Sequence, residues 1–147
     1  MKLDGKQLIR AKRHTVWEKL NDPDVLKQCI PGCREFTGSS EEGFEAVVTQ
    51  KIGPVKATFR GMISLSDVEP GRSYTINGEG KGGAAGFARG SVKVLLTDLP
   101  EGTELAYDAD ARIGGKLAQL GSRLVGGVSK KLTAQFFDKF GEIVENR

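Results

Sequence analysis

The chain has 147 residues, a length that suits one domain with a single hydrophobic core across residues 1–147. Apolar residues make up 38% of the chain and charged residues 28%, which excludes a disordered chain and is typical of a soluble globular protein. The net charge of +3 is too small to indicate a nucleic-acid partner. Because the chain has neither a signal-peptide run nor a membrane-spanning run of about 20 apolar residues, we expect a cytoplasmic location.

The N-terminal part of the chain predicts a strand followed by two short helices. Residues 1–9 alternate weakly between apolar and polar side chains, as in a strand. Residues 16–20 predict a first helix, which begins with a capping box at Thr15 or one turn earlier. Asp22 and Pro23 are the residue types preferred at the N-cap and at the first position of a helix, so they predict the start of the second helix.

The two cysteines, Cys29 and Cys33, are separated by Ile-Pro-Gly. This spacing differs from the Cys-x-x-Cys of thioredoxin-like sites, and no second Cys or His pair is present to complete a zinc site. We therefore expect two reduced thiols at the end of the second helix.

From residue 33 to residue 113 the hydrophobic period changes to two. Clean alternation predicts antiparallel strands with one face covered and the other in water. About six strands are expected in this region, and the alternation is clearest over residues 44–49, 55–65, 74–80, 89–96 and 104–111.

Residues 113–147 predict one long amphipathic helix. Its apolar side chains recur at spacings of three and four and form one stripe, made by Leu117, Leu120, Leu124, Val125, Val128, Leu132, Phe136, Phe140 and Ile143. Gly121 falls in the middle of the stripe, although a helix interior normally avoids glycine. Phe137 and Val144 fall opposite the stripe, where we expect them to be exposed.

This order of elements predicts an α+β fold. A curved antiparallel sheet of about seven strands would wrap around the long C-terminal helix, with the two short helices after the first strand. Matching the apolar faces across each turn pairs Leu65 with Tyr74, and Leu96 with Leu105. The second register also sets Lys93 against Asp108, an expected charge pair.

These registers, with the loop at residues 82–87 closed, align small residues across four strands, namely Gly61, Gly78, Gly90 and Ala111. Gly121 on the helix would face the same side. Glycine within a strand commonly marks a bend, a bulge or the close approach of a ligand. One interpretation is that these glycines only allow the sheet to curve. The other is a ligand-sized apolar cavity, which we favour because small residues are expected on both the sheet and the helix.

The candidate ligand-binding residues are the row of small residues and the apolar side chains expected around it. They are Phe59, Gly61, Ile63, Tyr74, Ile76, Gly78, Phe87, Gly90, Tyr107, Ala109, Ala111, Leu117, Leu120, Gly121 and Leu124.

Signs of catalysis, of a metal site or of a cofactor are lacking. Residues 78–83 match Gly-x-Gly-x-x-Gly but lead into another strand, so they predict a hairpin loop and no nucleotide site. His14 has no nucleophile or carboxylate partner and is expected on the surface. A basic flank on the last helix is interpreted as a solvated face, or as a contact with anionic lipid or an acidic partner, and consists of Lys116, Arg123, Lys130 and Lys131.

Four segments resemble one known family. They are Trp17 with residues 20–23 (Leu-Asn-Asp-Pro), residues 29–33 (Cys-Ile-Pro-Gly-Cys), residues 80–87 (Gly-Lys-Gly-Gly-Ala-Ala-Gly-Phe) and residues 114–123 (Gly-Gly-Lys-Leu-Ala-Gln-Leu-Gly-Ser-Arg). They resemble the CoxG family of carbon monoxide dehydrogenase subunits, which is similar to the SRPBCC superfamily of START and Bet v 1-like helix-grip proteins.

The resemblance implies a curved sheet gripping the C-terminal helix, with a hydrophobic cavity between them. It also implies an accessory role for molybdenum hydroxylases of the carbon monoxide dehydrogenase type, including recruitment of that enzyme to the membrane. It supplies no catalytic residue. Many members extend past the helix into a membrane-seeking tail, whereas this chain stops at Arg147, which argues against direct anchoring.

Three functions follow as hypotheses. The first is a non-enzymatic accessory protein that binds a lipid-like or quinone-like molecule, peripheral to the inner face of the membrane. The second is an enzyme of the cyclase or hydrolase type on the same fold, which needs a buried polar group in the cavity. The third is a docking module with no physiological ligand. Fold resemblance alone does not choose among them.

Overall fold

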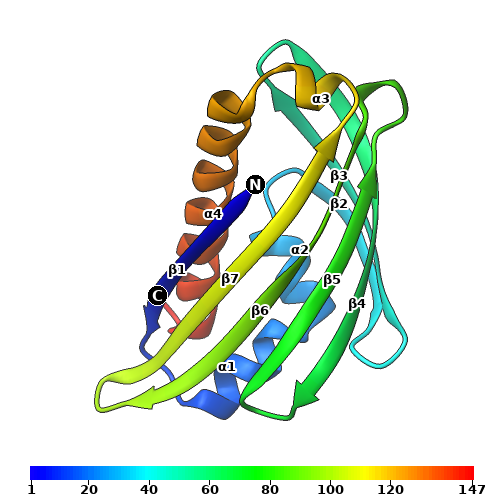
Figure 1. Cartoon of the computed structure of the whole chain (residues 1–147). Coiled ribbons are helices and arrows are strands. Elements are labelled where there is room, and N and C mark those ends of the chain that lie inside the picture. Colours follow the sequence, from blue (N-terminus) through cyan, green and yellow to red (C-terminus); the bar gives the residue numbers. More distant parts are fainter.

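A seven-stranded antiparallel sheet curves around a long helix in the computed structural model, which describes residues 1–147 (Figure 1). The elements are β1 (Lys2–Ile9), α1 (Arg13–Leu20), α2 (Pro23–Cys29), β2 (Cys33–Ser39), β3 (Gly43–Ile52), β4 (Val55–Glu69), β5 (Ser73–Lys81), a 3-10 turn (Gly83–Ala85), β6 (Phe87–Leu99), β7 (Gly102–Gly114), α3 (Lys116–Gln119) and α4 (Ser122–Val144). The strand order is β1-β7-β6-β5-β4-β3-β2, so β1 and β2 are the edge strands. The predicted α+β helix-grip fold is confirmed.

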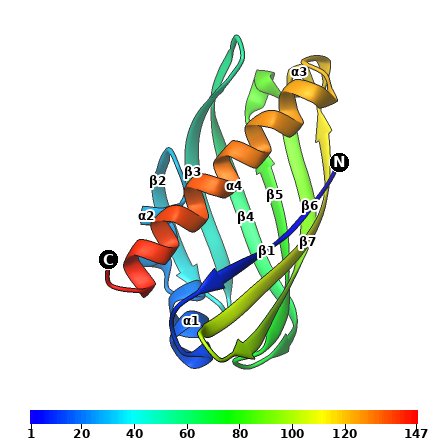
Figure 2. The same cartoon turned by 90° about the vertical axis from the view of Figure 1, so that its left-hand side faces the viewer.

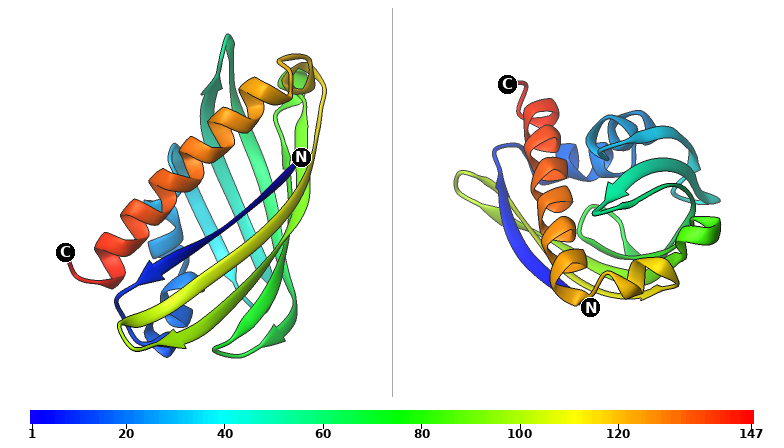
Figure 3. Two further views of the ribbon diagram at one scale, coloured as in Figure 1. Left: turned by 60° about the vertical axis from the view of Figure 1, so that its left-hand side comes forward. Right: turned by 90° about the horizontal axis from the view of Figure 1, so that it is seen from above.

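Helix α4 runs diagonally across the concave face of the sheet (Figure 2). Seen from above, the sheet bends around the helix (Figure 3). The main backbone neighbours of α4 are α2, β1, α1, β3 and α3, and not the central strands β4–β6. Only side chains therefore bridge the distance between α4 and the middle of the sheet.

The hydrophobic core lies where the C-terminal half of α4 meets α1, α2 and the sheet. Phe140 and Val16 are fully buried, and Leu96 and Leu105 are each 2% exposed. Leu96 and Leu105 occupy inward positions of the period-two pattern and pair directly across β6 and β7. This arrangement follows from the sequence, because alternating strands and an amphipathic helix bury their apolar sides against each other.

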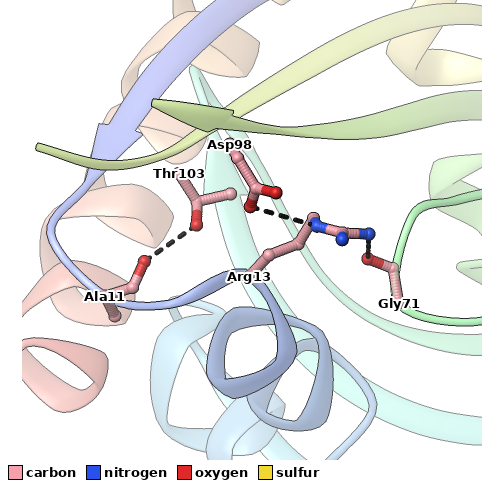
Figure 4. Close-up of polar contacts among 5 residues, drawn as sticks. All are labelled: Ala11, Arg13, Gly71, Asp98 and Thr103. Atoms are coloured by element: carbon pink, nitrogen blue, oxygen red, sulfur yellow. Dashed lines mark hydrogen bonds and ion pairs between the residues drawn. The ribbon is translucent and has the colours of Figure 1, made fainter. Parts of the chain in front are cut away.

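Polar contacts close the end of the molecule next to α1 (Figure 4). Arg13 Nε donates to Asp98 Oδ1 at 3.1 Å, and Arg13 Nη1 donates to the carbonyl oxygen of Gly71 at 3.1 Å. The hydroxyl of Thr103, which is fully buried, donates to the carbonyl oxygen of Ala11 at 2.8 Å. These bonds join the start of α1 to the β4–β5 and β6–β7 turns.

Helix α2 starts where the sequence predicts, whereas α1 starts one turn before Thr15. Helix α2 begins as expected, with Asp22 as the N-cap, whose side chain accepts from the backbone N–H of Asp24 at 2.9 Å. Helix α1 begins one turn before the proposed capping box, with Lys12 as its N-cap and no side-chain capping bond. The capping box at Thr15 is therefore wrong and the alternative start one turn earlier is confirmed, because the chain is already helical from Arg13.

Two of the predicted registers are confirmed and one is wrong. Gly78 pairs with Gly90, and Leu96 pairs with Leu105, as expected. Leu65, however, pairs with Ile76 and not with Tyr74. The register of β4 and β5 shifts between Ser66 and Glu69, next to Asp67 with its φ of 51°. The observed partner of Leu65 lies two residues from the expected one. An offset of two residues keeps the same side chains on the inner face, so matching apolar faces could not detect it.

The small residues consequently form two adjacent rows in place of one. Gly78, Gly90 and Ala111 share a row with Ile63. Gly61 belongs to the next row towards the β3–β4 turn, which contains Ala46, Gly61, Gly80 and Ala88. The concave face therefore lacks large side chains over a broader area than the sequence indicated.

The prediction of one continuous helix from residue 113 is wrong. Residues up to Gly114 belong to β7, α3 is a single turn, and the chain breaks at Gly121 before α4 begins. Gly121 has φ 88° and ψ 152°, a conformation that is essentially open only to glycine. It is exposed, and a Cβ at this position would meet no neighbouring atom within 4 Å. The glycine therefore redirects the chain between two helices and packs against no neighbouring side chain.

We expect Gly121→Ala to lower the free energy of unfolding by about 1–3 kcal/mol, because alanine is strained in this backbone conformation. The matched control is Gly127→Ala, which lies inside α4 with open space around its Cα. Alanine there should raise the free energy of unfolding by about 1 kcal/mol through its helix propensity. Denaturant unfolding of both variants measures the two changes, and an unchanged Gly121→Ala midpoint would contradict this account of the break.

Candidate functional site

A cavity of about 420 Å³ lies between the concave face of the sheet and helices α2 and α4. Its size falls in the range of small-molecule sites, about 300–1,000 Å³. The lining residues come from all seven strands and from the helical segments, and are Leu3, Leu20, Leu26, Ile30, Pro31, Phe36, Phe44, Val48, Gln50, Ile63, Leu65, Tyr74, Ile76, Val92, Val94, Leu105, Tyr107, Ala109, Leu132, Thr133, Phe136 and Phe137.

The chemistry of the cavity is almost wholly apolar. None of its lining residues carries a charge, and the polar side chains among them are Gln50, Thr133 and the two tyrosines. Tyr74 is 4% exposed, and burial raises the pKa of its hydroxyl, which therefore stays protonated at neutral pH. The site can hold an apolar molecule and offer it a few neutral hydrogen-bonding groups.

Aromatic contacts fix the two tyrosines in the wall. Tyr74 packs edge-on against Trp17 with ring centroids 5.0 Å apart. Tyr107 stacks on Phe137 with centroids 5.5 Å apart, and its hydroxyl lies against the backbone of Gly5 in β1. Both tyrosines therefore have defined ring positions.

Comparison with known proteins identifies the family. The model of the CoxG family of carbon monoxide dehydrogenase subunits matches residues 5–144, nearly the whole chain. The chain belongs to the CoxG family. Membership suggests an accessory role for carbon monoxide dehydrogenase, since the family takes its name from that enzyme. No curated protein matches the chain in sequence.

Solved structures place this CoxG-family chain among helix-grip proteins. It is similar to a conserved protein from Geobacillus kaustophilus, with 31% identity, a TM-score of 0.91 and coverage of 99% of this chain and 96% of that one. A protein from Rhizobium leguminosarum is 15% identical with a TM-score of 0.76, over 100% of this chain and 95% of that one. Protein MLL2253 from Mesorhizobium loti is 17% identical with a TM-score of 0.71, over 99% and 98%. The last two show the fold alone.

Part of the predicted CoxG ligand site lies in the cavity lining. The residues brought together there are Ile63, Tyr74, Ile76, Tyr107 and Ala109. Their contact with a ligand stays a prediction.

The other candidate residues lie elsewhere. Phe87, Ala111 and Gly121 line a separate hollow of about 440 Å³ beside Met1, at the end of β7. Gly78 and Gly90 border a polar depression on the outer face of the sheet. The remaining candidates line none of these three spaces, and are Phe59, Gly61, Leu117, Leu120 and Leu124.

Contacts explain where some of these side chains go. The ring of Phe59 covers Gly82 in the β5–β6 loop, and Leu124 contacts Gly53 in the β3–β4 turn. Leu117 in α3 is buried. These three side chains therefore pack within the α3 end of the molecule and not around the cavity.

One wall of the cavity, contributed by α2, β2 and β3, was not predicted from the sequence. Phe36 and Phe44 pack together there with ring centroids 5.1 Å apart, and both line the cavity. Their positions on alternating strands could have indicated an inward direction. Phe137 was expected to be exposed, but it also lines the cavity. That expectation is wrong, because the side of α4 that faces the sheet is wider than the stripe drawn from its strongest apolar spacings.

The remaining chemical groups lie away from the cavity centre. Cys29 is buried, and burial raises the pKa of its thiol to about 11, against the opposing charge of Lys139. Burial also raises the pKa of Cys33. Both thiols therefore stay protonated and weakly nucleophilic at neutral pH. His14 is exposed, as predicted. No three His, Cys, Asp or Glu side chains gather closely enough to hold a metal ion.

None of the helices combines the length and the hydropathy that crossing a bilayer requires.

Proposed function

We propose that this CoxG-family protein is a non-enzymatic accessory protein that carries a lipid-like or quinone-like molecule for a molybdenum hydroxylase of the carbon monoxide dehydrogenase type. The observation that carries the proposal is the 420 Å³ cavity with its uncharged, apolar lining. Such a lining favours apolar molecules, since each square ångström of apolar surface removed from water contributes about 25 cal/mol.

A quinone suits the partner's chemistry. A dehydrogenase that oxidises a small substrate must hand its electrons to an acceptor, and membrane quinones are apolar molecules that a water-filled site holds poorly. A protein with an apolar cavity can present such an acceptor outside the bilayer.

Charge distribution supports a peripheral contact with an anionic membrane. The α3 end of the molecule, made by residues 51–60, 79–89 and 112–123, carries one exposed carboxylate, Glu79, and exposed cations at Lys51, Lys56, Arg60, Lys81, Arg89, Arg112, Lys116 and Arg123. Because the whole chain has a net charge of only +3, the rest of the chain is net negative. This polarity would turn the α3 end towards a negatively charged surface.

A cyclase or hydrolase function finds less support. Such an enzyme needs a placed acid or base that can exchange a proton near neutral pH. The ionisable groups in the cavity lining are the two tyrosines, and burial moves the pKa of Tyr74 further from neutrality.

The test is the uptake of a long-tailed quinone from vesicles, followed by mass spectrometry of the protein after the vesicles are removed. We expect quinone to appear in the protein fraction, faster from anionic than from zwitterionic vesicles, with salt reducing the difference. Absence of uptake, together with purified protein free of any apolar molecule, would overturn the carrier function and favour a docking module. Equal rates from both kinds of vesicle would overturn the membrane contact alone.

A further inference from the structure

The cavity holds few groups that are free to donate a hydrogen bond to a ligand. Gln50 Nε2 donates to the carbonyl oxygen of Pro31. The hydroxyl of Thr133 donates to the carbonyl oxygen of Ser129 at 2.8 Å. Thr133 therefore already donates within the protein, and Gln50 uses one of its two amide N–H groups. The donors left in the lining are the second N–H of Gln50 and the tyrosine hydroxyls.

Tyr74 places an unpartnered hydroxyl in the lining. Its side chain is almost fully buried, and its hydroxyl makes no hydrogen bond within the protein. Every fully enclosed polar side-chain atom in the protein has a partner. The Tyr74 oxygen has none, so it borders open space. Tyr74 lines both this cavity and a depression among the outer residues of β5–β7, but it shares the inner face of β5 with Ile76, which directs its ring to the cavity side. A hydroxyl that has left bulk water without gaining a partner is unfavourable, and an acceptor on a ligand would relieve it.

Tyr107 offers a close comparison with a different environment. It lies in the same cross-strand row as Tyr74, separated by Val94 of β6. Its side chain is only half-buried, and its hydroxyl lies against Gly5 of the edge strand β1. This hydroxyl is therefore directed to the edge of the sheet.

The lining also limits the charge of the ligand. No lysine, arginine, histidine, aspartate or glutamate is among the lining residues. A carboxylate or an ammonium group would lose its hydration there without meeting an opposite charge, which is strongly unfavourable. The occupant is therefore neutral where it meets the cavity wall.

We propose that the Tyr74 hydroxyl donates a hydrogen bond to the carbonyl oxygen of a neutral apolar ligand, and that Tyr74 is the residue that determines this specificity. The inference rests on the proposed carrier function. A carbonyl matches the site because it accepts the bond from Tyr74 and brings no donor of its own into the apolar cavity.

Binding of three probes of equal chain length tests the proposal: a long-chain methyl ketone, the corresponding alkane and the corresponding fatty acid. Tyr74→Phe should weaken binding of the ketone about two- to tenfold, the usual net worth of one hydrogen bond, and leave alkane binding unchanged. The ionised acid should bind most weakly to wild-type protein. Tyr107→Phe is the matched control and should bind the ketone as tightly as wild-type protein does.

A second measurement needs no variant. The carbonyl stretching frequency of the bound ketone should lie below its value in a hydrocarbon solvent, because a hydrogen bond weakens the C=O bond. An unshifted band in wild-type protein would overturn the proposal, as would a loss of ketone affinity in Tyr107→Phe equal to that in Tyr74→Phe. Unchanged ketone binding in Tyr74→Phe would overturn this inference while the carrier function stands. Binding of neither probe would overturn the carrier function and this inference with it.

Discussion

Replacing Ala109 by phenylalanine is expected to reduce the uptake of an apolar ligand at least tenfold. Ala109 lies on β7 between Val92 of β6 and Leu3 of β1, and all three residues line the cavity. A phenyl ring attached there would project from the sheet into the cavity and occupy space that the ligand needs. A tenfold loss of affinity corresponds to about 1.4 kcal/mol, so partial exclusion of the ligand is enough.

The matched control for this variant is Ala106→Phe. Ala106 lies on the same strand but on its outer face, where it pairs with Lys6 and Leu95. A ring at that position leaves the cavity unchanged, so uptake should stay at the wild-type level. Fluorescence of a displaced apolar probe measures both variants, and thermal unfolding checks that each is folded. Equal uptake by the two variants would contradict the placement of the ligand in this cavity.

We expect Phe140→Ala to lower the free energy of unfolding by about 3–5 kcal/mol. Phe140 is fully buried, and its ring stacks on Phe136 with centroids 5.8 Å apart. It belongs to the core cluster that joins α4 to Val16 of α1 and Leu105 of β7. Removing the ring loses its burial and leaves a cavity in a region that cannot easily collapse. Since domains are stable by only about 5–15 kcal/mol, the loss is a large part of the total.

Phe87→Ala is the control for Phe140→Ala, because it deletes the same group from a side chain that is 38% exposed. Phe87→Ala should lower the free energy of unfolding by much less than Phe140→Ala does. Urea unfolding gives both values. Similar losses of unfolding free energy in the two variants would contradict the assignment of the core to the C-terminal half of α4.

The sequence predicted local features well. Period-two alternation correctly indicated the strands between residues 33 and 113. Asp22 and Pro23 correctly marked the start of α2. The β6–β7 register was also predictable, because Lys93 and Asp108 on the outer face favour the pairing that the inner face requires.

Prediction failed where one local pattern was compatible with two structures. The observed β4–β5 pairing differs from the expected one by two residues, which leaves every side chain on the same face. Gly121 fitted the spacing of a helical stripe, but spacing does not report backbone dihedrals, and its φ of 88° ends the short helix α3. The ligand site changed accordingly, since Gly121 lies beside the separate hollow near Met1.

The sequence by itself determined the class of the fold and the apolar character of its interior, because strand alternation, helix amphipathicity and capping are set by residues close together in the chain. Only the tertiary structure decided which of those apolar side chains surround an empty volume. Phe36 on β2, Tyr74 on β5 and Phe137 on α4 meet in one cavity lining although they are far apart in the chain. Their meeting depends on the curvature of the sheet, on the bulge in β4 and on the direction that α4 takes after Gly121.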